Sequence, residues 1–132
     1  MLVRTLLALF GFFHLLGGLY MLIAPHEWYA SVPGVTATGP FNHHFITDIG
    51  FAFAASGVGM MMAIRGGRIG AAFALAGATW PTLHALFHLW GWITGGVPSD
   101  TRILLSEALG VMLISFVGFA LAWLQVRRTG AN

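Results

Sequence analysis

The sequence contains no cysteine and no lysine, and charged residues make up only 8% of its 132 residues. Without cysteine, neither a disulfide nor a thiolate metal or redox site can form. A soluble domain carries about 25% charged residues, so the low charge argues against a soluble protein. The positive charge rests on six arginines, which are too few and too scattered for a nucleic-acid surface. Nucleic acid is therefore not an expected partner.

What the sequence does contain is long apolar segments. Hydrophobic residues make up 58% of the chain, and the mean hydropathy is +0.83. Four runs are each long enough to cross roughly 30 Å of hydrocarbon, and they cover residues 2–24, 41–64, 69–93 and 103–126. They are too long and continuous for barrel strands, and only helices or closed barrels satisfy their backbone in lipid. We therefore predict an all-α fold, an antiparallel four-helix membrane bundle forming a single domain over 1–132.

The first run is expected to stay in the protein as a membrane span. Arg4 resembles the basic start of a signal peptide, but Pro25 follows the run and no small-residue cleavage site precedes it. The first connection, residues 25–40, is longer than the others. Its start, from Pro25 to Tyr29, has the pattern of a short interfacial helix, and we expect the segment to form a lid over the outer mouth of the bundle.

The arginines predict the orientation of the bundle. With four spans, the two termini and the loop after the second span share one side of the membrane. Five of the six arginines fall on that side, and they are Arg4, Arg65, Arg68, Arg127 and Arg128. Arg102 alone falls on the other. Arginine is enriched on the cytoplasmic side of membrane proteins, so both termini are predicted to be cytoplasmic.

Six ionisable residues are expected at a similar depth, roughly 5 to 15 Å below the outer boundary at about 1.5 Å per helical residue. They are His14, His44, Asp48, His84, His88 and Glu107. His44 with Asp48 and His84 with His88 are four residues apart, so each pair shares a helix face. Small residues lie on the same stripes and mark helix–helix contacts in membranes. We therefore expect these polar groups to face the bundle interior.

Several kinds of site fit these residue types. A metal ion would take imidazole and carboxylate ligands from a set comprising His44, Asp48, His84, His88 and Glu107. A cofactor or ligand would contact the imidazoles of His14, His44, His84 and His88. Haem is one such cofactor, with His14 and His84 as axial ligands. A buried carboxylate beside histidines also suits a proton relay or a quinone site. A hydrogen-bonded network that only stabilises the bundle is the alternative without a ligand.

Parts of the chain resemble the DoxX-like small four-helix membrane proteins. The resembling stretches lie mainly in the first half, and they are Arg4–Leu7, His14–Gly18, Pro25–Gly34 and Asp48–Gly50. The resemblance implies a multi-pass protein of the bacterial inner membrane. Named members have been tied to quinone-linked or thiol-linked oxidation, and the absence of cysteine argues against a thiol role here. No catalytic residue is carried over from the family.

The functional prediction is a small multi-pass membrane protein with a histidine and carboxylate pocket in its outer half. The pocket would bind a metal or a small redox ligand, and the protein would serve as a subunit of a membrane oxidoreductase. The alternatives are a ligand-free accessory subunit and a carrier of a small lipophilic molecule such as a quinone. Besides the lipid bilayer, the candidate partners are a second membrane protein and another copy of the chain. No set of side chains has a distinctive catalytic spacing, so catalysis by the chain alone has the least support.

Overall fold

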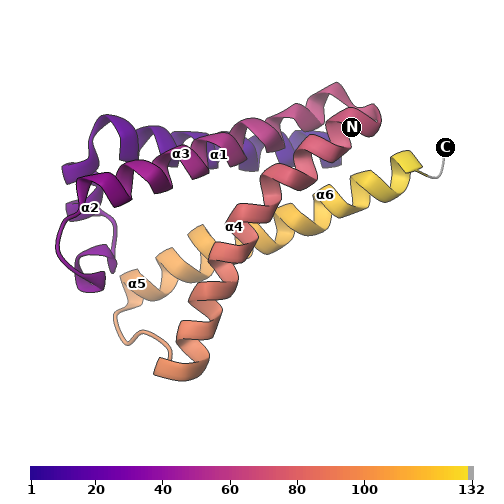
Figure 1. The fold of residues 1–132 in the computed structure, drawn as a ribbon. Helices are drawn as coiled ribbons and strands as arrows, with labels where there is room; N and C mark the ends of the chain where they lie inside the picture. The colour runs from indigo at the N-terminus through magenta and orange to yellow at the C-terminus, as the bar shows by residue number, and fades with distance from the viewer. Residues whose placement is uncertain (131–132) are drawn as a thin grey trace.

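The computed structural model describes residues 1–130, and all regular structure within them is helical (Figure 1). In chain order the elements are α1 (Leu2–Ile23), α2 (Pro25–Ser31), η1 (Val35–Thr38), α3 (His43–Met61), η2 (Met62–Arg65), α4 (Gly67–Gly95), α5 (Thr101–Leu105), η3 (Ser106–Leu113) and α6 (Ile114–Gly130). Elements α5, η3 and α6 follow one another without a break, and η3 is a π-helix.

Four helical segments are long and apolar enough to cross a membrane, as predicted. They are Leu2–Ile23, His43–Arg65, Gly67–Gly95 and Thr101–Gly130, so each predicted span is present with ends that differ by a few residues. Local capping explains several of these ends. Asn42 accepts a hydrogen bond from the Phe45 amide at the start of α3 (3.1 Å). Asp100 accepts one from the Arg102 amide at the start of α5 (2.8 Å), and this bond lowers the pKa of the Asp100 carboxyl.

Glycines hold α1 against α3. Gly11 packs on the backbone at Gly57, and Gly18 packs on the backbone at Gly50 and Ala54. A methyl group on Gly18 would lie 2.6 Å from both the Gly50 carbonyl oxygen and the Ala54 amide nitrogen. Such close approach is possible only for residues without a side chain, as is usual where membrane helices meet. The later position in α1 (Gly18) contacts the earlier position in α3 (Gly50), and the earlier position (Gly11) contacts the later one (Gly57). These two helices therefore run in opposite directions.

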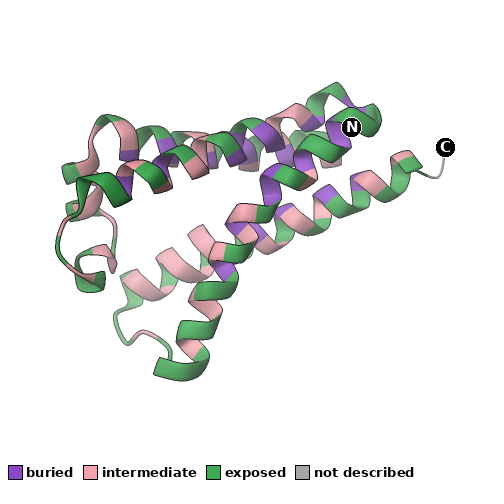
Figure 2. Cartoon of the chain, viewed as in Figure 1, coloured by how far each residue is buried: buried purple, intermediate pink, exposed green. Residues whose placement is uncertain are grey.

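Helix α4 joins this pair through Gly77. A methyl group there would lie 2.6 Å from the Met60 amide nitrogen and the Ser56 carbonyl oxygen of α3. The adjoining core consists of Leu7, Met60, Ala63, Ala74, Ala78 and Ala122. Figure 2 shows the buried residues gathered where α1, α3 and α4 meet. In contrast, α2 and α5 contain no buried residue, and α4 contains none beyond Ala85. Helix α4 is therefore tightly packed at the end where it begins and sparsely packed at the other, whereas α1 and α3 stay in contact towards both ends.

The tightly packed end carries most of the arginines, and we call it the arginine end (Arg4, Arg65, Arg68, Arg127 and Arg128). The Arg4 guanidinium lies directly on Gly66, and Gln125 of α6 donates to the Ala63 carbonyl (3.2 Å). These contacts bring both ends of the described chain and the α3–α4 turn together, as Figure 1 shows.

The opposite end, which we call the acid end, carries all four acidic side chains, Glu27, Asp48, Asp100 and Glu107. Helix α4 bends near its middle and diverges from α3 towards this end (Figure 1). The buried Pro81 lies within α4, and a proline inside a helix is a common cause of such a bend. The segment 25–40 lies at this end, where the left-handed Gly34 packs on Ile103 of α5. It therefore joins α1 and α3 to α5.

We predict that Gly18→Ala lowers the free energy of unfolding by roughly 1–3 kcal/mol, because the new methyl group meets backbone that cannot move aside. Gly17→Ala is the matched control, since nothing lies within 4 Å of a methyl group at that position. Thermal unfolding of both variants in detergent tests this. Equal loss of stability in the two variants would contradict the packing described here.

Candidate functional site

A row of ionisable side chains crosses the molecule on the acid-end side of the core, and we call it the histidine row (His14, His84, His88 and Glu107). His14 comes from α1, the two other histidines from α4, and Glu107 from the π-helix η3. Phe53 of α3 lies within the row, so every long helical segment contributes to it. The members of the row differ sharply in burial and in hydrogen bonding.

His14 is the most buried polar side chain of the row. It is only 2% exposed, and neither ring nitrogen has a hydrogen-bond partner within the described residues. It lies between Gly11 and Gly18, the two glycines that hold α1 against α3. Its ring centroid is 5.6 Å from that of Phe53. A buried polar group without a partner costs about 1–3 kcal/mol, so His14 calls for an explanation beyond packing.

His84 also lies beside Phe53, again with ring centroids 5.6 Å apart. Its ring stacks on Trp80 (6.1 Å) and meets His88 edge to face (4.8 Å). The Trp80 indole nitrogen is buried and has no hydrogen-bond partner within residues 1–130. Phe53 thus contacts two imidazoles from different helices, and a second unpartnered polar atom belongs to the tryptophan that stacks on one of them.

Glu107 closes the row at the acid end. One carboxylate oxygen lies 3.3 Å from His88 Nδ1, and the other accepts a hydrogen bond from the Trp92 indole (2.5 Å). The glutamate and histidine side chains are only 18% and 24% exposed. Glu107 sits in the first turn of the π-helix, a widened geometry that is frequent at functional sites. Sequence reasoning missed Trp92, although its position four residues after His88 places it on the same stripe.

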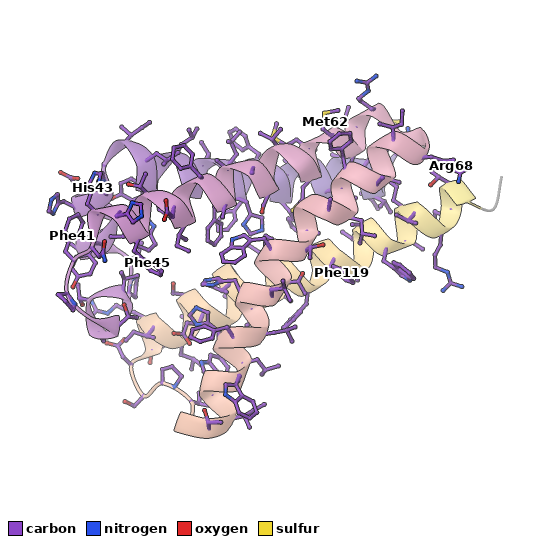
Figure 3. All side chains as sticks on the ribbon, viewed as in Figure 1. Phe41, His43, Phe45, Met62, Arg68 and Phe119 are labelled. Atoms are coloured by element: carbon purple, nitrogen blue, oxygen red, sulfur yellow. The ribbon has the colours of Figure 1, made fainter. Side chains whose placement is uncertain are left out.

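His44 and Asp48 do not belong to the row. They share a face of α3 as predicted, with 3.4 Å between the imidazole and the carboxylate, but their side chains are 90% and 60% exposed. The prediction that they face the bundle interior is therefore wrong. Gly50 and Gly57 turn the opposite face of α3 towards α1 and leave this pair outside. Figure 3 labels their neighbours His43 and Phe45 at the same first turn of α3.

A metal ion needs several histidine or carboxylate ligand atoms close together. Among residues 1–130, no three histidine or acidic side chains come close enough together to hold a metal ion. Among the predicted ligands, His88 and Glu107 form the one histidine–acid pair that is mostly buried in the described part of the chain. His14 and His84, the predicted axial ligands of haem, each lie 5.6 Å from Phe53, measured between ring centroids. Haem ligation by this pair stays a prediction.

Comparison with known proteins adds no assignment. No family model, no curated protein and no solved structure matches this chain.

We predict that Glu107→Ala lowers the free energy of unfolding by about 2 kcal/mol, because it leaves the Trp92 indole and His88 without their shared buried partner. Asp48→Ala removes the carboxylate of the other histidine–acid pair. Since that pair is exposed, its loss costs no more than about 1 kcal/mol.

Chemical unfolding of the two variants in one detergent provides the comparison. A similar small loss in both would mean that the Glu107 contacts contribute no more than surface contacts do.

Proposed function

We propose that this protein binds a small redox ligand at the histidine row and serves as a subunit of a membrane oxidoreductase. In this proposal the chain is an antiparallel four-helix bundle of the bacterial inner membrane. Both termini are cytoplasmic, and the acid end faces outwards. The gathering of five arginines at one end supports this orientation, because arginine is enriched on the cytoplasmic side.

The unpartnered His14 imidazole is the observation that carries the proposal. An imidazole has a donor and an acceptor nitrogen when neutral, and a ligand with carbonyl or hydroxyl groups would satisfy both needs. Buried polar atoms of this kind are otherwise satisfied by protein or by ordered water. The sparse packing towards the acid end supports access, since α4 has no buried residue beyond Ala85. A ligand that bridges His14 and His84 would also contact Phe53, which lies beside both imidazoles.

The rest of the row suits proton transfer to such a ligand. Reduction of an organic redox ligand consumes protons as well as electrons, and an imidazole can accept a proton at one nitrogen and release one from the other. Glu107 contacts His88, and His88 contacts His84. A proton taken up at the carboxylate would therefore have two imidazoles to pass through before it reached the ligand. Buried carboxylates and histidines in membrane spans are typical of proton relays.

A carrier of a small lipophilic molecule is the second candidate. A groove of about 410 Å³ lies between α3 and α4, and small residues such as Ala52, Ala55 and Gly59 line it together with Trp80. The volume is within the range of small-molecule sites. The metal-binding and DoxX-like hypotheses stay predictions. The first has His88 and Glu107 as its best-placed ligands, and the second rests on the sequence resemblance alone.

The first test is to purify the protein gently in detergent and to analyse it for metals, visible absorption and extractable organic molecules. We expect a near-stoichiometric organic ligand in the wild type and its loss in His14→Leu, because the leucine offers no hydrogen bond. His43→Ala is the control, since it removes an exposed histidine outside the row and should retain the ligand.

Two other outcomes of this experiment would favour the alternative functions. Metal retained by the wild type and lost in His88→Ala would select the metal hypothesis. The other result would be a folded wild type that carries no ligand and no metal, together with a His14→Leu variant at least as stable as the wild type. That result would contradict ligand binding and favour an accessory subunit without a ligand.

A further inference from the structure

A second groove lies between α4 and α6, on the arginine-end side of the histidine row. Its volume is about 560 Å³. Arg68 and Thr129 lie towards the helix ends, and the groove continues along the apolar side chains of Ala71, Ala72, Leu75 and Val126. Figure 3 shows Arg68 at the end of α4 that lies beside the last turns of α6. One end of the groove is therefore cationic and the rest is apolar.

The charge at this end has no counterpart in the described chain. Arg68 forms no ion pair with any of residues 1–130; the one arginine–carboxylate pair there joins Arg102 to Asp100 at the acid end. Four more arginines share the arginine end, whereas all four acidic side chains lie at the other. A negatively charged ligand would thus meet attraction and no repulsion from a side-chain carboxylate.

We propose that this groove binds one anionic phospholipid, with its phosphate on the Arg68 guanidinium and an acyl chain along the Ala71–Ala72–Leu75 surface. Basic pockets between membrane helices are typical sites for anionic lipid headgroups. The guanidinium suits a phosphate because it donates two parallel hydrogen bonds. A free phosphate ion would leave the apolar length of the groove unfilled. A zwitterionic lipid would fill that length, but its attached cation would weaken the attraction to the arginines.

The test uses the intact chain, delipidated in detergent and examined by native mass spectrometry with three probes. The probes are phosphatidylglycerol, phosphatidylcholine with the same acyl chains, and inorganic phosphate. We expect one phosphatidylglycerol to bind in preference to the other two. Arg68→Gln should weaken that binding about fivefold, in line with the contribution of one arginine at a membrane surface. Arg128→Gln removes the same charge at the same end without lining the groove, so it should weaken binding less.

A second pair of variants tests the apolar part of the groove. Ala72→Leu adds bulk inside it and should weaken phosphatidylglycerol binding, whereas Ala55→Leu adds the same bulk in the α3–α4 groove and should not. Both alanines are exposed, so neither change disturbs the core.

Three results would overturn the proposal. The first is equal weakening by the two arginine variants, which would indicate general surface charge. The second is equal binding of the two lipids. The third is phosphate binding that depends on Arg68 and equals lipid binding, which would indicate a free-anion site.

Discussion

The close contact of glycines between helices is the constraint on which the rest of this structure depends. Gly11 and Gly18 of α1 meet Gly57 and Gly50 of α3 at distances that leave no room for a methyl group. His14 lies between the first two glycines and Phe53 between the second two. The contacts that fix the two helices therefore also bring the His14 imidazole beside the Phe53 ring. Gly77 extends the arrangement to α4, and His84 follows it two turns later.

Gly11 and Gly18 hold α1 and α3 together from the middle of α1 towards the acid end, whereas Gly77 holds α4 against α3 only in the first half of α4. The uneven packing is therefore that of α4, which has no buried residue beyond Ala85. The core of Leu7, Met60 and several alanines belongs to the arginine end. Towards the acid end, α4 diverges from α3 (Figure 1). There, fewer contacts connect the helices, chiefly those of Glu107 with His88 and Trp92 and that of Gly34 with Ile103. A rigid end beside a looser end suits a protein that must admit a ligand, since binding regions are drawn from the less stable parts of a structure.

Much of this fold is readable from the sequence. The long apolar runs predict the four helices, because few other structures satisfy a backbone in lipid. Asn42 and Asp100 are recognisable caps, and four spans place both ends of the described chain on the same side as the α3–α4 turn. The similar height of His14, His84, His88 and Glu107 within the bundle also follows from the sequence, because distance along a helix is a simple count of residues. Their depth in a membrane stays a prediction. His84 and His88 face each other as their spacing requires.

Helix faces and helix geometry were harder to predict. Helix α3 has glycines on more than one side, and the expectation that the stripe of His44 and Asp48 faces the bundle interior was wrong. Only the pairing with α1 shows that Gly50 and Gly57 form that contact. No local sequence signal indicates the π-helix that carries Glu107. Nor does any spacing rule bring Phe53 beside two histidines from different helices.

The uneven packing can be measured directly, since the chain has no native cysteine and pairs of spin labels can be introduced without background. One pair at Val58 and Phe73 spans the α3–α4 contact near Gly77, and another at Phe45 and Trp90 spans the same helices towards the acid end. All four positions are more than half exposed. The account predicts a short, narrow distance distribution for the first pair and a longer, broader one for the second. Equally short and narrow distributions for both pairs would contradict it.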